Sequence, residues 1–183
     1  MKIVIDLQSL QTQSRFRGIG RYSLALTKAI IKNKKDHEIV IALSNLFPDT
    51  IEEIKEEFKE LLPKQNIKIW NAISPTKECE EENKPNRKTS QLLREMFLSN
   101  LKPDILLIAS LSEGYIGDAV LSIQDYKTKI PTVTILYDLI PFISPQKYLS
   151  HKPTSLWYYN KIDILKKSNS LLSISNSAKK EAI

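Results

Sequence analysis

The chain contains 183 residues, of which 42% are hydrophobic and 26% charged, and its formal net charge is +6. This length suits one globular domain with one substantial core and excludes two large domains. The single cysteine, Cys79, lies in a charged stretch, which excludes a disulfide framework and a cysteine-based metal site and fits a reducing compartment. No apolar run approaches the roughly 18 residues of a membrane span. We therefore expect a cytoplasmic protein that is not integral to a membrane.

Basic residues are dense in two segments, 28–35 and 161–180, which we expect to form helix surfaces. The simplest interpretation is a solvated basic face. A second is peripheral contact with the inner face of the cytoplasmic membrane, because basic segments gain free energy near acidic lipids. Neither a recognition motif nor an interleaved aromatic and basic stripe accompanies the charge, so nucleic acid is not expected as a partner.

Strand-like and helix-like patterns alternate along the chain. Nearly continuous apolar runs predict strands at 3–7, 38–43, 67–70, 105–109, 131–137 and 170–174. Apolar spacing of three to four residues predicts helices at 19–32, 51–62, 90–101, 119–125 and 153–167, and another that begins near 176. Repeated strand–helix units with such strands indicate a mainly parallel sheet covered on both faces. The predicted fold class is a Rossmann-like, doubly wound α/β fold.

Three segments have more particular expectations. Residues 8–17 are predicted to form a polar loop. Asp49 and Glu52 have the spacing of a capping box, which predicts the start of a helix that ends at Pro63. Residues 74–89 are charged, punctuated by proline and without period, which predicts an exposed, mobile loop. The helix that begins near 176 has less than two turns and no stop signal. We therefore expect residues 1–183 to be one domain of a longer polypeptide.

Only four glycines occur, in the clusters Gly18/Gly20 and Gly114/Gly117, whereas average composition would give about a dozen. Each cluster follows a predicted strand, where an α/β protein keeps its ligand crevice. This placement predicts a phosphate-handling loop. The first cluster lacks the third glycine of a dinucleotide fingerprint and the second strand ends without an acid, so a nicotinamide site is not expected.

Gly18 and Gly20 open a predicted helix, where free backbone N–H groups and the positive end of the helix dipole favour an anion. Arg15, Arg17 and Arg21 crowd the same loop, and arginine suits phosphate. The alternative is that the two glycines only let the helix pack closely on the sheet.

Two acidic residues also follow predicted strands. Asp138, after Tyr137, could orient a hydroxyl group or cap backbone amides. Glu113, beside Gly114, could accept hydrogen bonds from a sugar or be a solvated turn residue. Both positions fall at the carboxyl edge of the predicted sheet, where the strand ends meet.

Four segments carry a family pattern in chain order: Asp6-Leu7-Gln8-Ser9-Leu10-Gln11, Arg15-Phe16-Arg17-Gly18-Ile19-Gly20-Arg21-Tyr22, Tyr137-Asp138-Leu139-Ile140-Pro141 and Ile174-Ser175-Asn176-Ser177-Ala178-Lys179. Together they resemble the N-terminal half of group 1 (family 4) glycosyltransferases, particularly the bacterial mannosyltransferase-like enzymes of surface-polysaccharide assembly. The resemblance implies the GT-B architecture, in which two Rossmann-like domains face a cleft. It further implies that residues 1–183 are the acceptor-side domain and that the C-terminal nucleotide-sugar-binding domain is not included.

The resemblance also implies roles for particular residues. It places Gly18 and Gly20 in a loop whose amides face the donor diphosphate, and it matches Ser175 to a serine at the end of the last strand. Tyr137 stands where many relatives have histidine, so no imidazole role transfers to it. The candidates are therefore Asp138 and Tyr137 for catalysis, and Gly18, Gly20, Arg17, Arg21, Glu113, Gly114 and Ser175 for substrate binding.

The function that follows from the resemblance is retaining transfer of a sugar, mannose by likeness, from a nucleotide-sugar to a saccharide or lipid-linked acceptor. No cofactor and no metal are expected, because cationic groups and helix N-termini can stabilise the departing diphosphate. The chain alone is expected to be inactive. One alternative is a non-catalytic α/β phosphate- or nucleotide-binding module, which the glycine–helix pattern supports equally well. Another is a basic adaptor for membranes or nucleic acid.

Overall fold

The computed structural model describes residues 1–126 and 129–183. Its six strands form one parallel sheet in the order β3-β2-β1-β4-β5-β6. The strands are β1 (Lys2–Asp6), β2 (Glu38–Ser44), β3 (Ile67–Trp70), β4 (Ile105–Ile108), β5 (Thr132–Leu136) and β6 (Ser170–Ser173). The helices are α1 (Gly18–Lys32), α2 (Pro48–Phe58), α3 (Lys84–Asn100), α4 (Ile140–Ile143), α5 (Pro145–Tyr148), α6 (Lys152–Leu165) and α7 (Asn176–Glu181). This arrangement confirms the predicted Rossmann-like α/β fold.

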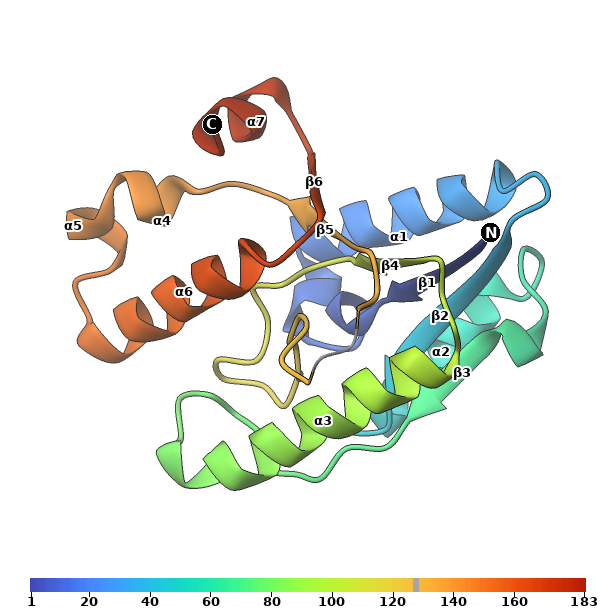
Figure 1. Ribbon diagram of the computed structural model, residues 1–183, viewed down its shortest axis with the longest axis horizontal. Helices are drawn as coiled ribbons and strands as arrows, with labels where there is room; N and C mark the ends of the chain where they lie inside the picture. The colour runs from blue at the N-terminus through green and yellow to red at the C-terminus, as the bar shows by residue number, and fades with distance from the viewer. Residues whose placement is uncertain (127–128) are drawn as a thin grey trace.

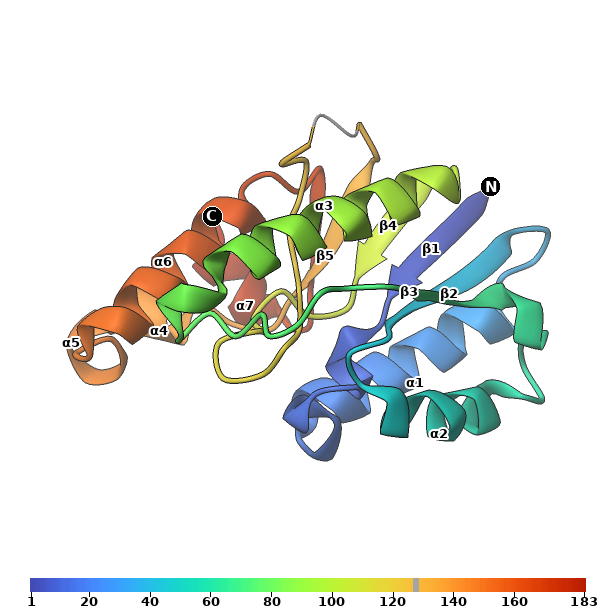
Figure 2. The same cartoon turned by 90° about the horizontal axis from the view of Figure 1, so that it is seen from below.

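The sheet lies between two helical layers, with α1 and α2 on one face and α3 and α6 on the other (Figure 2). Adjacent residues of β1 show why both faces are apolar. Ile5 packs in the same cluster as Phe58 of α2, whereas Val4 packs with Leu98 of α3 and Ile164 of α6. Side chains alternate along a strand, so a strand covered on both faces must be apolar at every position.

The strand order reverses between β1 and β4, which are neighbours in the sheet. The chain runs outward from β1 through β2 to β3 and then crosses back to β4. Ligands of open α/β sheets bind at such a reversal, outside the carboxyl ends of the strands. The loops after β1 and β4 meet there, so this edge is where a site is expected.

A buried polar network joins these two loops. Asp6, at the end of β1, forms an ion pair with Arg94 of α3 at 2.6 Å, and both side chains are almost fully buried. Gln8 donates to Asp6 at 3.1 Å and to the carbonyl of Val120 at 2.9 Å. A buried charge pair persists only when its remaining polar atoms also find partners. Asp6 and Gln8 thus fix the loop after β1 against the loop after β4.

The predicted helix over 119–125 is wrong. Its residues from Ala119 to Ile123 are all buried, so the segment lacks the solvent-facing side of an amphipathic helix. Side chains satisfy its backbone instead: Val120 N–H donates to Gln8 Oε1 at 3.0 Å, and Arg94 donates to the Ser122 carbonyl at 3.0 Å.

The predicted exposed loop over 74–89 is wrong for residues 84–89, which are helical, and for the buried Thr76, whereas residues 74–80 form a loop. Thr76 is fully buried, and its N–H donates to Asp118 Oδ1 at 2.6 Å. Helix α3 already begins at Lys84, with Pro85 in its first turn, where proline is tolerated. Of the two prolines in this segment, Pro75 lies in the loop and Pro85 marks the start of a helix.

Two smaller expectations change as well. The predicted polar loop over 8–17 contains two short 3₁₀ helices, Gln8–Leu10 and Gln13–Phe16. Helix α2 begins at Pro48, and its N-cap has no side-chain hydrogen bond, so the predicted capping box does not form. Two further 3₁₀ turns, Lys64–Asn66 and Glu81–Asn83, precede β3 and α3. Within the described residues, no helix is both long and apolar enough to cross a membrane.

Candidate substrate-binding site at the carboxyl edge of the sheet

A cavity of about 250 Å³ opens between the loops that follow β1 and β4. We call it the edge cavity. Its lining residues are Thr12, Gln13, Ser14, Arg17 and the run from Ser112 to Gly117. Of the candidate residues, Arg17, Glu113 and Gly114 are therefore brought together. The lining combines hydroxyl, amide and backbone groups, one carboxylate and one guanidinium with the apolar surfaces of Tyr115 and Ile116, a mixture that suits a ligand with both polar and apolar faces.

Glu113 is the buried charge of this cavity, with an exposed fraction of only 6%. Its carboxylate accepts hydrogen bonds from the Thr12 hydroxyl at 2.9 Å and from the Ser110 hydroxyl at 3.1 Å. Burial raises the pKa of Glu113, and hydrogen bonds and the charge of Lys161 oppose that rise. A buried carboxylate already ringed by hydroxyl donors is chemically suited to further hydroxyl groups.

Gly114 has a positive φ of 95°, which L side chains rarely adopt. A Cβ at this position would also lie 2.5 Å from the carbonyl oxygen of Ala119. The loop carbonyls of Gly114 and Tyr115 accept the N–H groups of Glu78 and Cys79 at 2.8 and 2.9 Å. The glycine therefore serves a tight turn that is clamped to the segment around Glu78.

A second buried ion pair supports the same turn. Lys161 of α6 lies 2.6 Å from Glu78 Oε1, and its side chain is 3% exposed. Burial lowers the pKa of Lys161, and the charge of Glu78 opposes that effect. Neither residue was among the sequence candidates. The sequence signal that could have identified Lys161 is its spacing of three residues from both Tyr158 and Ile164. This spacing places Lys161 on the buried face of α6.

The two glycines at the start of α1 differ. A Cβ on Gly20 would lie 2.4 Å from Arg15 Cα and 2.5 Å from the Ser14 carbonyl oxygen, so Gly20 is required by packing within the chain. That packing is against the 3₁₀ turn before α1, not against the sheet. Nothing lies within 4 Å of a Cβ on Gly18, and Gly18 is exposed. Only Gly18 leaves the helix N-terminus open to an outside group.

Arg17 and Arg21 are both exposed, Arg17 at the N-cap of α1 and Arg21 one turn later. Arg15 is engaged elsewhere, since it pairs with Glu53 at 3.2 Å and lies over the Phe16 ring. Of the three arginines in this part of the described chain, Arg17 and Arg21 are therefore the two that remain available to an outside group. They place positive charge where the helix dipole is also positive.

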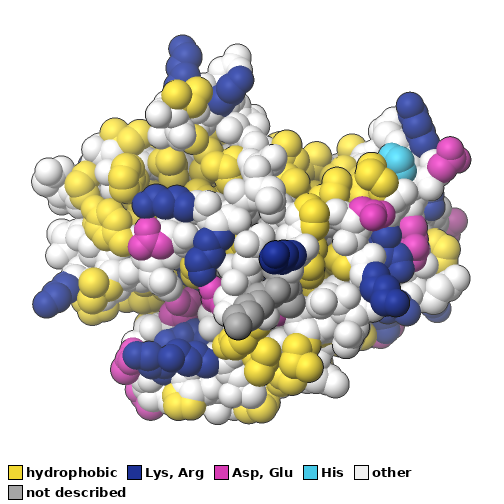
Figure 3. Space-filling model, viewed as in Figure 1, with side chains coloured by type: hydrophobic (Ala, Val, Ile, Leu, Met, Phe, Trp, Pro, Cys, Tyr) yellow, Lys and Arg dark blue, Asp and Glu magenta, His cyan; other side chains and the backbone are white. Residues whose placement is uncertain are grey.

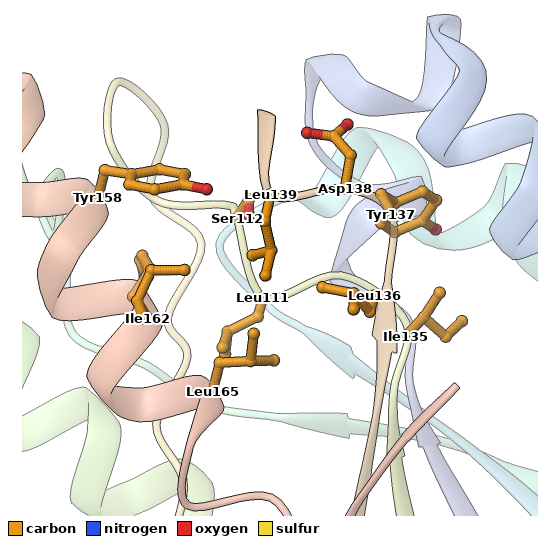
Figure 4. A pocket seen from close by; sticks show the side chains of 11 residues that line it. Leu111, Ser112, Ile135, Leu136, Tyr137, Asp138, Leu139, Tyr158, Ile162 and Leu165 are labelled. Atoms are coloured by element: carbon orange, nitrogen blue, oxygen red, sulfur yellow. The ribbon is translucent and has the colours of Figure 1, made fainter. Parts of the chain in front are cut away.

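Tyr137 and Asp138 diverge from consecutive positions after β5 (Figure 4). The Tyr137 hydroxyl lies 2.9 Å from the Ser23 hydroxyl and donates to the Ala109 carbonyl at 3.0 Å. Burial raises the pKa of Tyr137 to about 12. Asp138 is exposed and accepts the Ile140 N–H at 3.1 Å. Tyr137 thus ties β5 to β4 and α1, and Asp138 has one carboxylate oxygen left for other contacts.

Tyr137 and Asp138 line a second, smaller cavity of about 40 Å³ together with Ser112, Tyr158 and Lys161 (Figure 4). Ser112 lines both cavities, so the two are adjacent. Ser175 lies apart, at the end of β6, where its side chain caps α7 by accepting the Ala178 N–H at 3.1 Å. Within the described part of the chain, no group of three or more His, Cys, Asp or Glu side chains could hold a metal ion.

The fold and this edge define a Rossmann-like α/β domain with a cavity at its topological switch point. No protein-family model matches the chain. Over 184 aligned residues, which include the whole chain, it is 33% identical to a serotype-specific mannosyltransferase, WbdA, of Escherichia coli, and it covers 22% of that protein. Two further E. coli proteins of the same name are 30% and 28% identical over 159 residues, which is 86% of the chain and 20% of each relative.

The chain is therefore homologous to one segment of a bacterial mannosyltransferase, which confirms the resemblance found in its sequence. It spans about a fifth of the length of the curated relatives that it matches.

Proposed function

We propose that this chain is the acceptor-side domain of a retaining mannosyltransferase in surface-polysaccharide synthesis. The enzyme would move mannose from a nucleotide-sugar to a saccharide or lipid-linked acceptor. In this proposal a second, nucleotide-sugar-binding domain completes a GT-B cleft. Homology to proteins named mannosyltransferase supports the sugar and the reaction class. The edge cavity, with the buried Glu113 in its lining, supports a binding role for this domain.

The buried carboxylate of Glu113 is the observation that carries the proposal. It lies in the lining of the edge cavity with Thr12 and Ser110 hydroxyls already bonded to it. A carboxylate repels phosphate but accepts hydrogen bonds strongly from hydroxyl groups. The edge cavity should therefore take a neutral sugar, in line with the expectation that Glu113 could accept hydrogen bonds from a sugar.

The size of the cavity agrees with one sugar ring. At about 250 Å³ it is smaller than the roughly 300 Å³ at which sites for drug-sized ligands begin, which favours a single sugar ring over a nucleotide. The diphosphate of the donor would instead face the exposed start of α1. Gly18 leaves that helix N-terminus open, and Arg17 and Arg21 add positive charge beside it.

The proposed mechanism divides the work between these two places. The edge cavity holds the acceptor so that its reactive hydroxyl meets the donor sugar, which lowers the entropic part of the barrier. Arg17, Arg21 and the α1 N-terminus stabilise the charge that develops on the departing diphosphate. Asp138 is exposed and lies two residues after the end of β5, at the same edge of the sheet. We propose that it orients a substrate hydroxyl group. Tyr137 holds β5 in place for Asp138.

The binding part is testable on the chain alone by ¹⁵N NMR titration. We expect methyl α-mannoside to shift the amide signals of Glu113, Gly114 and Tyr115 at millimolar concentration. Inorganic phosphate should shift the Gly18 amide and leave the Gly114 amide in place. The opposite pattern, with phosphate at Gly114 and no response to the mannoside, would favour the phosphate-binding module instead.

A further inference from the structure

One wall of the edge cavity is aromatic. Tyr115 lines the cavity two residues after Glu113, and its side chain is half-buried. The Tyr115 ring packs against Trp157 of α6, with the ring centroids 5.1 Å apart and the ring planes tilted by 41°. The neighbouring Ile116, which also lines the cavity, is 74% exposed. A buried carboxylate and an aromatic ring therefore come from the same short loop.

The two sides of the cavity differ in polarity. The loop after β1 contributes only polar or charged side chains: Thr12, Gln13, Ser14 and Arg17. The aromatic side adjoins α6, to which Trp157 belongs. Apolar side chains gather at this end of the molecule, over α4 and α6, in the space-filling view (Figure 3). A ligand in the cavity thus meets hydrogen-bonding groups on one side and an apolar surface on the other.

The Tyr115 ring is held in place by contacts with three other segments. Its hydroxyl accepts a hydrogen bond from the Thr154 hydroxyl at 3.2 Å, and Thr154 lies 3.0 Å from Nδ1 of His151. The backbone carbonyl of Tyr115 accepts the Cys79 N–H at 2.9 Å. A ring that is fixed before binding loses little conformational entropy when a ligand settles on it. The tyrosine is therefore pre-organised as a contact surface.

A cyclic sugar matches this combination of groups. A pyranose ring carries hydroxyl groups around its edge and C–H groups across its faces. The hydroxyl groups suit the Glu113 carboxylate, and the weakly positive C–H hydrogens suit the negative face of an aromatic ring. An open-chain polyol offers similar hydroxyl groups without a fixed apolar face. Glu113 and Tyr115 together can therefore distinguish a sugar ring from other polyhydroxyl compounds.

We propose that Tyr115 is the stacking platform for the acceptor sugar and that the edge cavity selects pyranosides with an unobstructed C–H face. The side of the Tyr115 ring away from Trp157 lies against that face, while Glu113 accepts hydrogen bonds from the sugar hydroxyl groups. Tyr115 is thus a specificity-determining residue. The inference rests on the proposed function, because it takes the edge cavity to be the acceptor-sugar site.

A nucleobase is the competing occupant, because bases also stack on aromatic side chains. The buried Glu113 carboxylate argues against it, since a carboxylate repels the phosphates that accompany the base in a nucleotide. Adenosine, which carries no phosphate, is therefore the appropriate probe for this alternative.

NMR titration of the ¹⁵N-labelled chain with methyl α-mannoside tests the platform. We expect Tyr115→Leu, which keeps apolar bulk but removes the ring, to raise the dissociation constant about five- to tenfold. Tyr115→Phe keeps the ring and should change it less than about twofold, as should the control Tyr148→Leu, which alters an exposed tyrosine outside the cavity. Mannitol should bind the parent about fivefold more weakly or worse, and equally in Tyr115→Leu. Circular dichroism confirms the folding of each variant.

Tryptophan emission gives a second measurement that needs no change at Tyr115. The chain has two tryptophans. Trp157 contacts the Tyr115 ring, whereas Trp70 is 1% exposed in β3. Saturation of the parent with methyl α-mannoside should therefore change the emission, and the change should disappear in Trp157→Phe. An unchanged emission at saturation would contradict the platform.

The outcomes separate this inference from the proposed function. If Tyr115→Leu binds the mannoside as the parent does while Glu113→Gln binds it more weakly, the platform is refuted and the acceptor site stands. Equal losses in Tyr115→Leu and Tyr148→Leu, mannitol binding as tight as that of the mannoside, or tighter binding of adenosine would also refute the platform. If the parent binds neither the mannoside nor mannitol, the edge cavity is not a sugar site and the proposed function fails with it.

Discussion

Glu113 and Lys161 are buried ionisable groups on either side of the Gly114 turn. Each is held by specific partners: Glu113 by the hydroxyls of Thr12 and Ser110, and Lys161 by the carboxylate of Glu78. Burial of a charge costs free energy, and proteins tolerate it mainly where the group has partners or a function. The two groups therefore provide direct tests of how the site is built.

We expect Glu113 to make stability fall as pH rises. Its pKa is higher in the folded chain than its ordinary value of 4.5 because burial disfavours the charged form. The folded state therefore holds the proton more tightly than the unfolded state, so stability is lost from about pH 4.5 upward through the raised value. In urea unfolding at pH 4–8, the free energy of unfolding of the parent relative to E113Q should decline as the pH rises. A constant or rising difference would contradict the burial argument.

Lys161 should be far more important to stability than an exposed lysine on the same helix end. Lys161→Met leaves the Glu78 carboxylate buried without its partner, and we expect a loss of about 3–5 kcal/mol in the free energy of unfolding. The matched control Lys166→Met breaks an exposed pair with Asp163 and should cost less than about 1 kcal/mol. The double variant K161M/E78Q should recover part of the loss. Equal losses for the two lysines would refute the structural role of the buried pair.

At the scale of elements, the start of α1 separates two glycines that the sequence treats alike. Gly20 packs against the backbone of the 3₁₀ turn before α1, whereas Gly18 faces open space. The sequence alone could not distinguish them, because the difference depends on where Ser14 and Arg15 fold back onto the helix.

The pair gives a matched prediction. Gly20→Ala should destabilise the chain by about 1–3 kcal/mol, because the new Cβ meets backbone atoms that cannot rotate away. Gly18→Ala should be neutral or stabilise by up to about 1 kcal/mol, since it restricts the unfolded chain without a clash. Thermal unfolding of both variants decides the matter. If Gly18→Ala is as harmful as Gly20→Ala, the account of this helix start fails.

Strands and long helices were predictable because their apolar periodicity is local. The strand at 3–7 is buried on both faces and reads as an unbroken apolar run. The buried segment 119–123 was not predictable, since its apolar residues serve an irregular loop whose backbone is satisfied by Gln8 and Arg94 from distant positions. Glu113 was predictable because it lies beside Gly114, one of only four glycines in the sequence. The partner of Lys161 comes from another part of the chain, so no local pattern could reveal it.

At the scale of the whole molecule, the parallel sheet brings the loops after β1 and β4 together at one edge. The edge cavity lies there, the exposed start of α1 adjoins it through Arg17, and helices α4 and α5 project on the same side (Figure 1). The chain spans about a fifth of the length of its mannosyltransferase relatives. We expect this domain alone to be unable to transfer sugar, because the donor side of the proposed cleft belongs to a second domain.

The most direct test is the kinetics of mannose transfer by a polypeptide in which this chain precedes a nucleotide-sugar-binding domain. We predict that Glu113→Gln raises the KM for the saccharide acceptor about tenfold, as the loss of a hydrogen bond to a charged group implies, while the KM for the donor changes less than about twofold. The exposed control Glu57→Gln should change neither. A rise in the donor KM with the acceptor KM unchanged, or sugar transfer by the 183-residue chain alone, would contradict the assignment of this domain to the acceptor side.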